Sequence, residues 1–330
     1  MILAYHHAAT RTARWQRERD HLAQRTPDWA KDRHAALSAA PRAGTSPAVE
    51  PPEIFDRRLR RLRRDRAAPR FADHGFVRDA IVEGLLDRLD LVKRDFTQAL
   101  DLGTTDGSLM RALEARGIAV TPSDAGARFA GEGVQTDEDH LPFAPESFDL
   151  IVSAGVLDSV NDLPGALIQC RRALKPDGLF LAGFVGAGSL AFLKRALLSA
   201  DEAAGGGIPQ RVHPLIDVRA AGDLLTRAGF VLTVADGESL DVGYGDPFRL
   251  MADLRGMAAT NLLAGPKLPL TRGRLAHLAQ SFTDAAGPDG RLRERFELIF
   301  MTGWAPGPDQ PQPARRGSAT ASLAAALRSG

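Results

Sequence analysis

The sequence predicts an α/β fold, in which a seven-stranded and mostly parallel sheet has helices on both of its faces. From residue 71 onward, apolar runs of strand length alternate with amphipathic stretches of helix length. Strands that alternate with helices pair in parallel, because the helices serve as crossover connections. A chain of 330 residues, of which 44% are hydrophobic, is long enough to bury one such core and to carry extensions.

The first half of the predicted sheet lies between residues 71 and 153. Phe76, Ala80 and Leu85 recur at helical spacing and predict the first helix. Strands are then expected at residues 96–102, 118–123, near 134 and at 148–153, with a helix at 107–116. The last of these strands is apolar along most of its length, as expected for a sheet that is covered on both faces.

The second half begins with a helix at residues 163–174, which Asp162 caps and in which Pro164 is an early proline. The turn at 175–178 leads into a strand at 179–184. After these come a Gly-rich insertion at 186–216, a helix at 217–228, a strand at 230–234, two further helical stretches and a closing strand at 296–304. We expect this closing strand to run antiparallel to the others.

Composition divides the chain into three parts. Residues 1–52 are polar and rich in Arg and Ala, so we expect a disordered or loosely helical extension. Residues 53–304 form the domain, which includes a basic helix at 55–66 and the insertion at 186–216. The Pro-rich residues 305–330 are expected to form a mobile tail.

Charge and cysteine content exclude several classes of function. The chain has 42 Lys and Arg residues against 41 Asp and Glu residues, so its overall charge gives no reason to expect nucleic-acid binding. No apolar run approaches the ~20 residues of a membrane span. The single cysteine, Cys170, lies at helical spacing with Leu167 and Leu174 and is expected to be a buried core thiol. These features predict a cytoplasmic protein of a bacterium, with peripheral membrane contact left open.

The most informative segment is the strand at 96–102 and the turn that follows it. Asp101 ends an apolar run, and Gly103 and Gly107 lie in a turn that opens a helix. Glycine allows backbone to approach a ligand closely, and the helix N-terminus offers free N–H groups. The segment resembles motif I of class I S-adenosyl-L-methionine (SAM) methyltransferases, with Thr105 at the position of the usual middle glycine. The resemblance implies SAM as the cofactor and a Rossmann-like fold.

Further acidic residues follow motif I in the order that a SAM site requires. Asp124, at the end of the second strand, is placed to accept hydrogen bonds from the ribose hydroxyls. Asp137, followed by Glu138, lies just after the third strand, where the adenine amino group is expected. Ser153 and Asp158 follow the fourth strand and should border the methyl group, so Asp158 is the candidate catalytic base. Its alternative role is that of a surface carboxylate beside a helix.

The basic helix has two interpretations. Six arginines lie between positions 57 and 64, while Phe55, Leu59 and Leu62 form an apolar stripe. The helix either presents a solvated face while the stripe contacts the domain, or it contacts an acidic partner or an anionic lipid surface. Spacing among the eight histidines supports no metal site.

Most of residues 53–322 is similar to the methyltransferase-fold family that includes NADH dehydrogenase (complex I) assembly factor 5. The segments that carry the resemblance are 54–57, 100–103, 141–143, 160–164, 174–178, 227–230, 250–257, 302–304 and 316–320. The more distant malonyl-carrier-protein O-methyltransferases share the same core. The resemblance implies modification of an arginine on a complex I subunit, which would be contacted through the basic helix.

The chain departs from the family pattern at two places. Residues 104–106 replace the usual Cys-Gly-x, and residues 157–160 replace a Leu-His-Trp-Val segment. Three functions therefore remain open. The protein is a SAM-dependent enzyme acting on a protein in complex I assembly, an assembly module that has lost catalysis, or a carboxyl O-methyltransferase.

Overall fold

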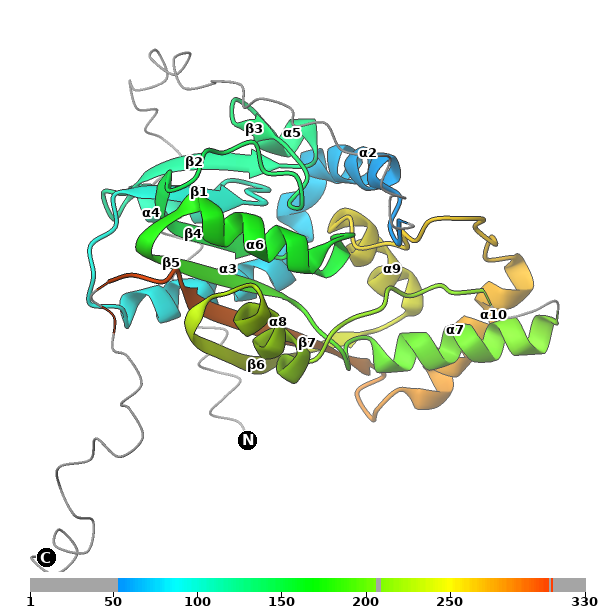
Figure 1. Cartoon of the computed structure of the whole chain (residues 1–330). Coiled ribbons are helices and arrows are strands. Elements are labelled where there is room, and N and C mark those ends of the chain that lie inside the picture. The colour runs from blue at the N-terminus through cyan, green and yellow to red at the C-terminus, as the bar shows by residue number, and fades with distance from the viewer. Residues whose placement is uncertain (1–52, 206–208, 309, 311–330) are drawn as a thin grey trace, which may run out of the picture.

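The computed structural model describes residues 53–205, 209–308 and 310, and Figure 1 shows a central sheet with helices on both sides. The seven strands have the order β3-β2-β1-β4-β5-β7-β6, and β7 runs antiparallel to both of its neighbours. The predicted fold class is therefore confirmed, including the antiparallel closing strand. The strands are β1 Gln98–Leu102, β2 Ala119–Asp124, β3 Val134–Gln135, β4 Phe148–Ala154, β5 Leu174–Val185, β6 Val231–Tyr244 and β7 Leu292–Trp304.

The helices follow the predicted alternation. Those before β4 are α2 Arg57–Ala67, the 3-10 helix η3 Ala68–Asp73, α3 Phe76–Asp90, α4 Ser108–Glu114 and α5 Ala127–Ala130. Those after β4 are the 3-10 helix η4 Leu157–Ser159, α6 Leu163–Ala173, α7 Ala191–Ala204, α8 Val218–Arg227, α9 Pro247–Gly256 and α10 Arg272–Ala285. As the sequence predicts, Asp162 caps α6 by accepting a hydrogen bond of 2.8 Å from the backbone N–H of Gly165.

The core forms two apolar layers, one on each face of the sheet. Ala99 and Leu100 are adjacent in β1 and belong to opposite layers, because side chains alternate along a strand. Ile81 of α3 belongs to the first layer, and Leu167 of α6 belongs to the second. The buried Cys170 also lies in the second layer, and burial raises the pKa of its thiol to about 12. The interpretation of Cys170 as a core thiol is confirmed.

Two segments differ from the sequence prediction. Residues 186–216 contain a regular helix, α7, which packs against α10 through an edge-to-face contact of Phe192 and Phe282. The expected short strand at 230–234 continues to Tyr244, because β6 pairs with β7 along almost its whole length. Its polar residues 236–239 resemble a loop in the sequence, and only the partner strand makes them regular.

In the described part of the chain, the folded domain extends slightly beyond the predicted end at residue 304. Ala305 is buried, and its backbone N–H donates a hydrogen bond of 2.8 Å to the carbonyl of Gly178. The predicted extension at 1–52 and most of the predicted tail lie outside the described residues. In the described ranges, no helix is both long enough and apolar enough to cross a membrane.

Candidate functional site

The motif I turn lies where β1 ends, at the carboxyl edge of the parallel strands. Gly103, Thr105 and Gly107 all have positive φ, with values of 86°, 52° and 70°. A Cβ atom on Gly103 would lie 2.5 Å from a methyl group of Val156, so only glycine fits there. Thr105 instead holds a β-branched side chain in the left-handed region, which is uncommon and strained. The turn thus holds Thr105 in a backbone conformation that glycine adopts more readily.

Asp101 lies beneath this turn with an unsatisfied carboxylate. The residue is fully buried, and neither carboxylate oxygen makes a hydrogen bond of normal geometry among the described residues, although the hydroxyl of Thr104 lies near enough to lower the pKa of Asp101. Burial raises the pKa of Asp101 to about 6, although the positive charge of Arg78 acts in the opposite direction. Buried polar groups without partners are rare in proteins and mark places where a ligand or a water completes the bonding.

Arg78 of α3 holds the turn from the other side. Its guanidinium donates 2.9 Å hydrogen bonds to the carbonyl of Thr104 and to Oδ1 of Asp106, and a 2.7 Å bond to Oγ of Ser108. The sequence analysis did not select Arg78. In the sequence, Arg78 is distinguished only as a basic residue in the first turn of the helix that precedes motif I.

The predicted acids meet at one edge of the sheet. Asp124 ends β2 and accepts a 2.8 Å hydrogen bond from the backbone N–H of Gly126. Asp137 and Glu138 follow β3, and all three of these acids are buried. Of these acids, Asp124 adjoins the motif I turn, because its Oδ2 accepts a hydrogen bond of 3.4 Å from the backbone N–H of Thr105.

These three carboxylates, and that of the neighbouring Asp139, are all paired with arginines of α2. The four pairs are Arg57 with Asp139, Arg60 with Glu138, Arg61 with Asp137, and Arg64 with Asp124. The arginines lie at positions i, i+3, i+4 and i+7, so they share one face of the helix. We call this set the α2–acid cluster.

The two innermost pairs of the cluster are bidentate. Nη1 and Nη2 of Arg60 lie 2.7 and 2.8 Å from the two carboxylate oxygens of Glu138. Arg64 reaches both oxygens of Asp124, with Nε at 2.7 Å, and its Nη2 also donates to the Thr105 hydroxyl at 3.1 Å. Arg64 therefore occupies the carboxylate that was predicted to hold the ribose.

Of the two interpretations of the basic helix, the solvated face is wrong for its central arginines, which are also too buried to contact a partner. Arg60 is 4% exposed and Arg64 is 7% exposed, whereas Leu62 of the supposed apolar stripe is 43% exposed. The buried face of α2 is thus made largely of arginine, because carboxylates are available opposite it. Phe55 does anchor the start of the helix, since it packs with Leu262 and Leu263.

Ser153 and Asp158, which the sequence analysis predicts to border the methyl group, lie in different environments. Ser153 is fully buried and donates a 2.8 Å hydrogen bond to the carbonyl of Leu102, which ties β4 to β1. Asp158 is partly buried in η4, and burial raises its pKa to about 6 against the opposing charges of Arg60 and Arg64. A carboxylate with such a pKa is suited to accept a proton near neutral pH.

The α2–acid cluster leaves little free space. The cavity between Arg57, Arg60 and the carboxylates that face them has a volume of about 10 Å³. Pockets for small molecules and cofactors usually have roughly 300 to 1,000 Å³. Among the described residues, no group of three or more His, Cys, Asp or Glu side chains is arranged to hold a metal ion.

The comparisons with known proteins agree with this geometry. Residues 100–182 match the methyltransferase domain family. The chain is 33% identical over 304 residues to the mitochondrial arginine-hydroxylase NDUFAF5 of Rattus norvegicus, and the match covers 88% of each protein. The chain belongs to the NDUFAF5 family. The human member is 32% identical with the same coverage. A malonyl-[acyl-carrier protein] O-methyltransferase of Halorhodospira halophila is 30% identical over 271 residues, which is 77% of this chain and 90% of that protein.

Proposed function

We propose that this NDUFAF5-family protein binds SAM at the motif I turn and uses it to modify an acceptor group. The observation that carries the proposal is the buried, unpartnered carboxylate of Asp101 beneath the Gly103 turn. In this assignment Asp101 and the turn hold the methionine part of SAM, Asp124 accepts from the ribose hydroxyls, and Asp137 with Glu138 borders the adenine. SAM supplies an electrophilic methyl group on a sulfonium.

The proposal carries a structural condition. The ribose needs both oxygens of Asp124, and Arg64 occupies both. Arg64 must therefore release Asp124 when SAM binds, whereas Asp101 is already available. Thr105 interacts with Arg64 through its hydroxyl, so the departure from the family motif and the arginine act at the same point.

The acceptor follows first from the relatives named arginine-hydroxylases. We propose that the protein methylates an arginine of a protein substrate during complex I assembly, since SAM would supply a methyl group but no oxidant for a hydroxylation. Asp158 is placed to take up the proton that the arginine nitrogen would lose. The exposed arginines of α2, such as Arg58 and Arg66, remain available to contact an acidic complex I subunit. This role fits a cytoplasmic protein that makes peripheral contact with a membrane-bound assembly.

Two specific observations favour the other candidates. A pocket beside β6 contains two guanidinium groups that have no partner among the described residues, as a carboxyl O-methyltransferase would need for a carboxylate substrate. The Arg64 pair and the strained Thr105 favour an assembly module without catalysis.

Calorimetric titration with SAM tests the proposal. We expect saturable binding that Asp101→Asn weakens, with Asp90→Asn as the matched control because Asp90 is an exposed acid paired only with Arg116. Absence of SAM binding in the wild-type protein and in Arg64→Gln would refute the enzymatic assignment and leave the assembly module.

A further inference from the structure

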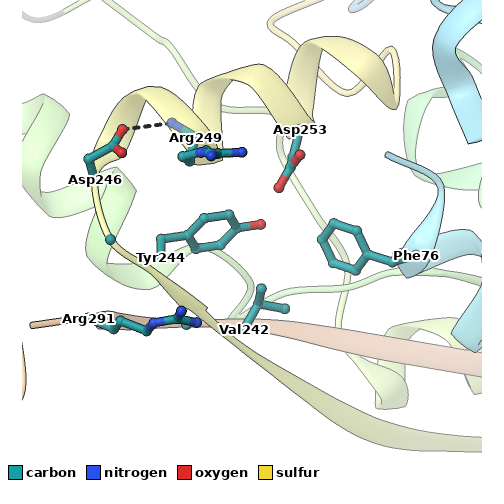
Figure 2. Close-up of a pocket in the computed structure, with 9 residues that line it drawn as sticks. Phe76, Val242, Tyr244, Asp246, Arg249, Asp253 and Arg291 are labelled. Carbon is teal, nitrogen blue, oxygen red and sulfur yellow. Dashed lines mark hydrogen bonds between the residues drawn. The ribbon is translucent and has the colours of Figure 1, made fainter. Parts of the chain in front are cut away.

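A second site lies between the end of β6, the start of α9 and the start of α3. It is a pocket of about 540 Å³, and the residues important here are Phe76, Tyr244, Asp246, Arg249, Asp253 and Arg291. Figure 2 shows Arg249 and Arg291 on opposite sides of the Tyr244 ring, with Asp253 and Phe76 near its hydroxyl. The volume falls in the range of small-molecule binding sites.

The carboxylates of this pocket are already engaged. Asp246 caps α9, because its Oδ1 accepts hydrogen bonds from the backbone N–H groups of Phe248 and Arg249 at 2.8 and 2.9 Å. Oδ1 of Asp253 lies 2.8 Å from Nδ1 of His74. Both acids thus have local partners that explain their presence.

The guanidinium groups of Arg249 and Arg291, unlike these carboxylates, have no local partners among the described residues. Within the described residues, the side chains of Arg249 and Arg291 form no ion pair or hydrogen bond. By contrast, Arg57 and Arg60, which line the small cavity of the α2–acid cluster, are both paired with carboxylates. Two free guanidinium groups at one pocket favour a negatively charged ligand, since arginine binds carboxylates with paired, charge-assisted hydrogen bonds.

Tyr244 provides an independent observation. The residue is 4% exposed, and its hydroxyl makes no hydrogen bond of normal geometry among the described residues, although Asp253 lies near enough to affect its pKa. Burial is the main reason that the pKa of Tyr244 is raised, and the negative charge of Asp253 acts in the same direction. The hydroxyl therefore stays protonated and can donate a hydrogen bond into the pocket.

The pocket is connected to the motif I turn through α3. Phe76 and Arg78 lie in the first turn of this helix; Phe76 lines the pocket, and Arg78 holds Thr104 and Asp106 of the turn. Tyr244 ends β6, which has the same direction as the parallel strands because β7 is antiparallel to both β5 and β6. The pocket and the turn therefore lie at the same edge of the sheet, as expected for an acceptor beside a cofactor.

We propose that this pocket binds a carboxylate group of the acceptor, with Arg249 and Arg291 as its cationic partners and Tyr244 as a hydrogen-bond donor. The proposal rests on the general part of the proposed function, the SAM-dependent modification of an acceptor, and specifies one chemical group that the acceptor carries. An acidic side chain would agree with a protein substrate, whereas a small organic acid would favour the carboxyl O-methyltransferase. The ring of Phe76 and the side chain of Val242 offer apolar contacts to the chain that carries the carboxylate. Either a small organic acid or an acidic side chain of a protein substrate supplies this chemistry.

The experiment titrates the full-length protein with pimelate, with its uncharged dimethyl ester, and with a short Gly-Glu-Gly peptide whose ends are blocked. We expect pimelate or the peptide to bind and the ester not to bind. Binding of pimelate alone identifies a small organic acid as the source, and binding of the peptide identifies an acidic side chain. Arg249→Gln and Arg291→Gln should each weaken binding about tenfold, the size expected for losing a charge-assisted hydrogen bond.

The matched control is Arg255→Gln, because Arg255 lies on the same helix, is exposed and donates only to the carbonyl of Met251. Tyr244→Phe should weaken binding with little change in the melting temperature, since the hydroxyl makes no hydrogen bond of normal geometry that the substitution would remove from the described residues. Equal binding of acid and ester, equal losses in Arg255→Gln and Arg249→Gln, or no binding of either acid would overturn the proposal.

SAM titrations of the same variants separate this proposal from the proposed function. Arg249→Gln should leave SAM affinity unchanged, because Arg249 is absent from the motif I turn and from the α2–acid cluster. Carboxylate binding in a protein that does not bind SAM would support the pocket and refute the proposed function. SAM binding without carboxylate binding would support the proposed function and overturn the pocket proposal.

Discussion

The substitution Arg64→Gln tests whether α2 competes with SAM for Asp124. Glutamine removes the charge and the bidentate contact while it keeps much of the side-chain length. Asp124 would still accept the hydrogen bond from the backbone N–H of Gly126 at 2.8 Å, so the carboxylate keeps a local partner. We therefore expect the variant to fold and to bind SAM more tightly than the wild-type protein.

The expected gain follows from the contacts that SAM must displace. Arg64 makes two charge-assisted hydrogen bonds to Asp124 and one bond to Thr105. Suppose that the arrangement in which Arg64 binds Asp124 is favoured by about 1.4 to 2.8 kcal/mol over the one in which Asp124 is released. Only a small fraction of the protein can then bind SAM, and the apparent affinity for SAM falls by roughly 10- to 100-fold. Arg64→Gln should recover a gain of this size in a calorimetric titration.

The variant should also be less stable. Removing one partner from a buried ion pair leaves the other insufficiently compensated, which costs up to about 3 to 5 kcal/mol when the remaining charge has no other contacts. Since Asp124 retains Gly126, a loss of roughly 1 to 2 kcal/mol is a reasonable expectation. Arg58→Gln, an exposed position on the same helix, provides the control and should alter neither melting temperature nor affinity.

A reduced SAM affinity in Arg64→Gln would refute the competition argument, because it would mean that Arg64 helps to build the site. Amide hydrogen exchange gives a second measure. SAM should accelerate exchange around residue 64 in the wild-type protein if the arginine leaves Asp124, and faster exchange is the opposite of the protection that simple ligand contact produces.

Three further predictions concern residues of the motif I site. Thr105→Gly should raise SAM affinity, because it relieves a β-branched residue at φ 52° and removes a contact of Arg64; unchanged affinity in titration would show that the turn has adapted. Asp124→Asn should weaken SAM binding by ~1.5 to 3 kcal/mol and lower the melting temperature, and in a double-mutant cycle with Arg64→Gln the stability losses should not add. Asp101→Asn should change the pH dependence of stability. Because the pKa of Asp101 is raised from 3.8 to about 6 in the fold, its protonated form stabilises the protein fully below pH 4, and this contribution is lost as pH rises through 6. At pH 7 the variant should be more stable by on the order of 1 to 3 kcal/mol, while at pH 4 the two proteins should melt alike.

The sheet could be predicted from the sequence because its evidence is local. The apolar run that ends at Asp101, the glycines of the turn and the capped start of α6 each lie within a short stretch of chain. The order of the acids was also readable, since each follows the end of a strand. The antiparallel β7 confirms a prediction that came from the resemblance and the closing position of the strand.

The pairing of these acids could not be predicted, because it joins distant parts of the chain. Arg64 and Asp124 are 60 positions apart, and Arg60 and Glu138 are 78 apart. In a single helix, arginines at i, i+3, i+4 and i+7 look like a solvated face, and only the carboxylates opposite them make burial favourable. The pocket at Tyr244 was missed for the same reason, since its residues come from positions 76 to 291.

The two arginine groups of this protein differ in a way that bears on function. Those of α2 already have carboxylates of the protein as partners, so a ligand that needs these carboxylates must replace a guanidinium. Arg249 and Arg291 lack such partners in the described part of the chain, so an anionic ligand would add contacts without breaking any. A near-zero net charge, 42 basic against 41 acidic residues, hides this difference. Binding at the motif I turn should therefore be an exchange of partners that is limited by Arg64, whereas binding at the second pocket should be a direct capture. The salt dependence of ligand affinity would distinguish the two sites. Added salt should weaken binding at the second pocket more, because exposed, unpaired guanidinium groups are screened more strongly than the buried pairs of the α2–acid cluster.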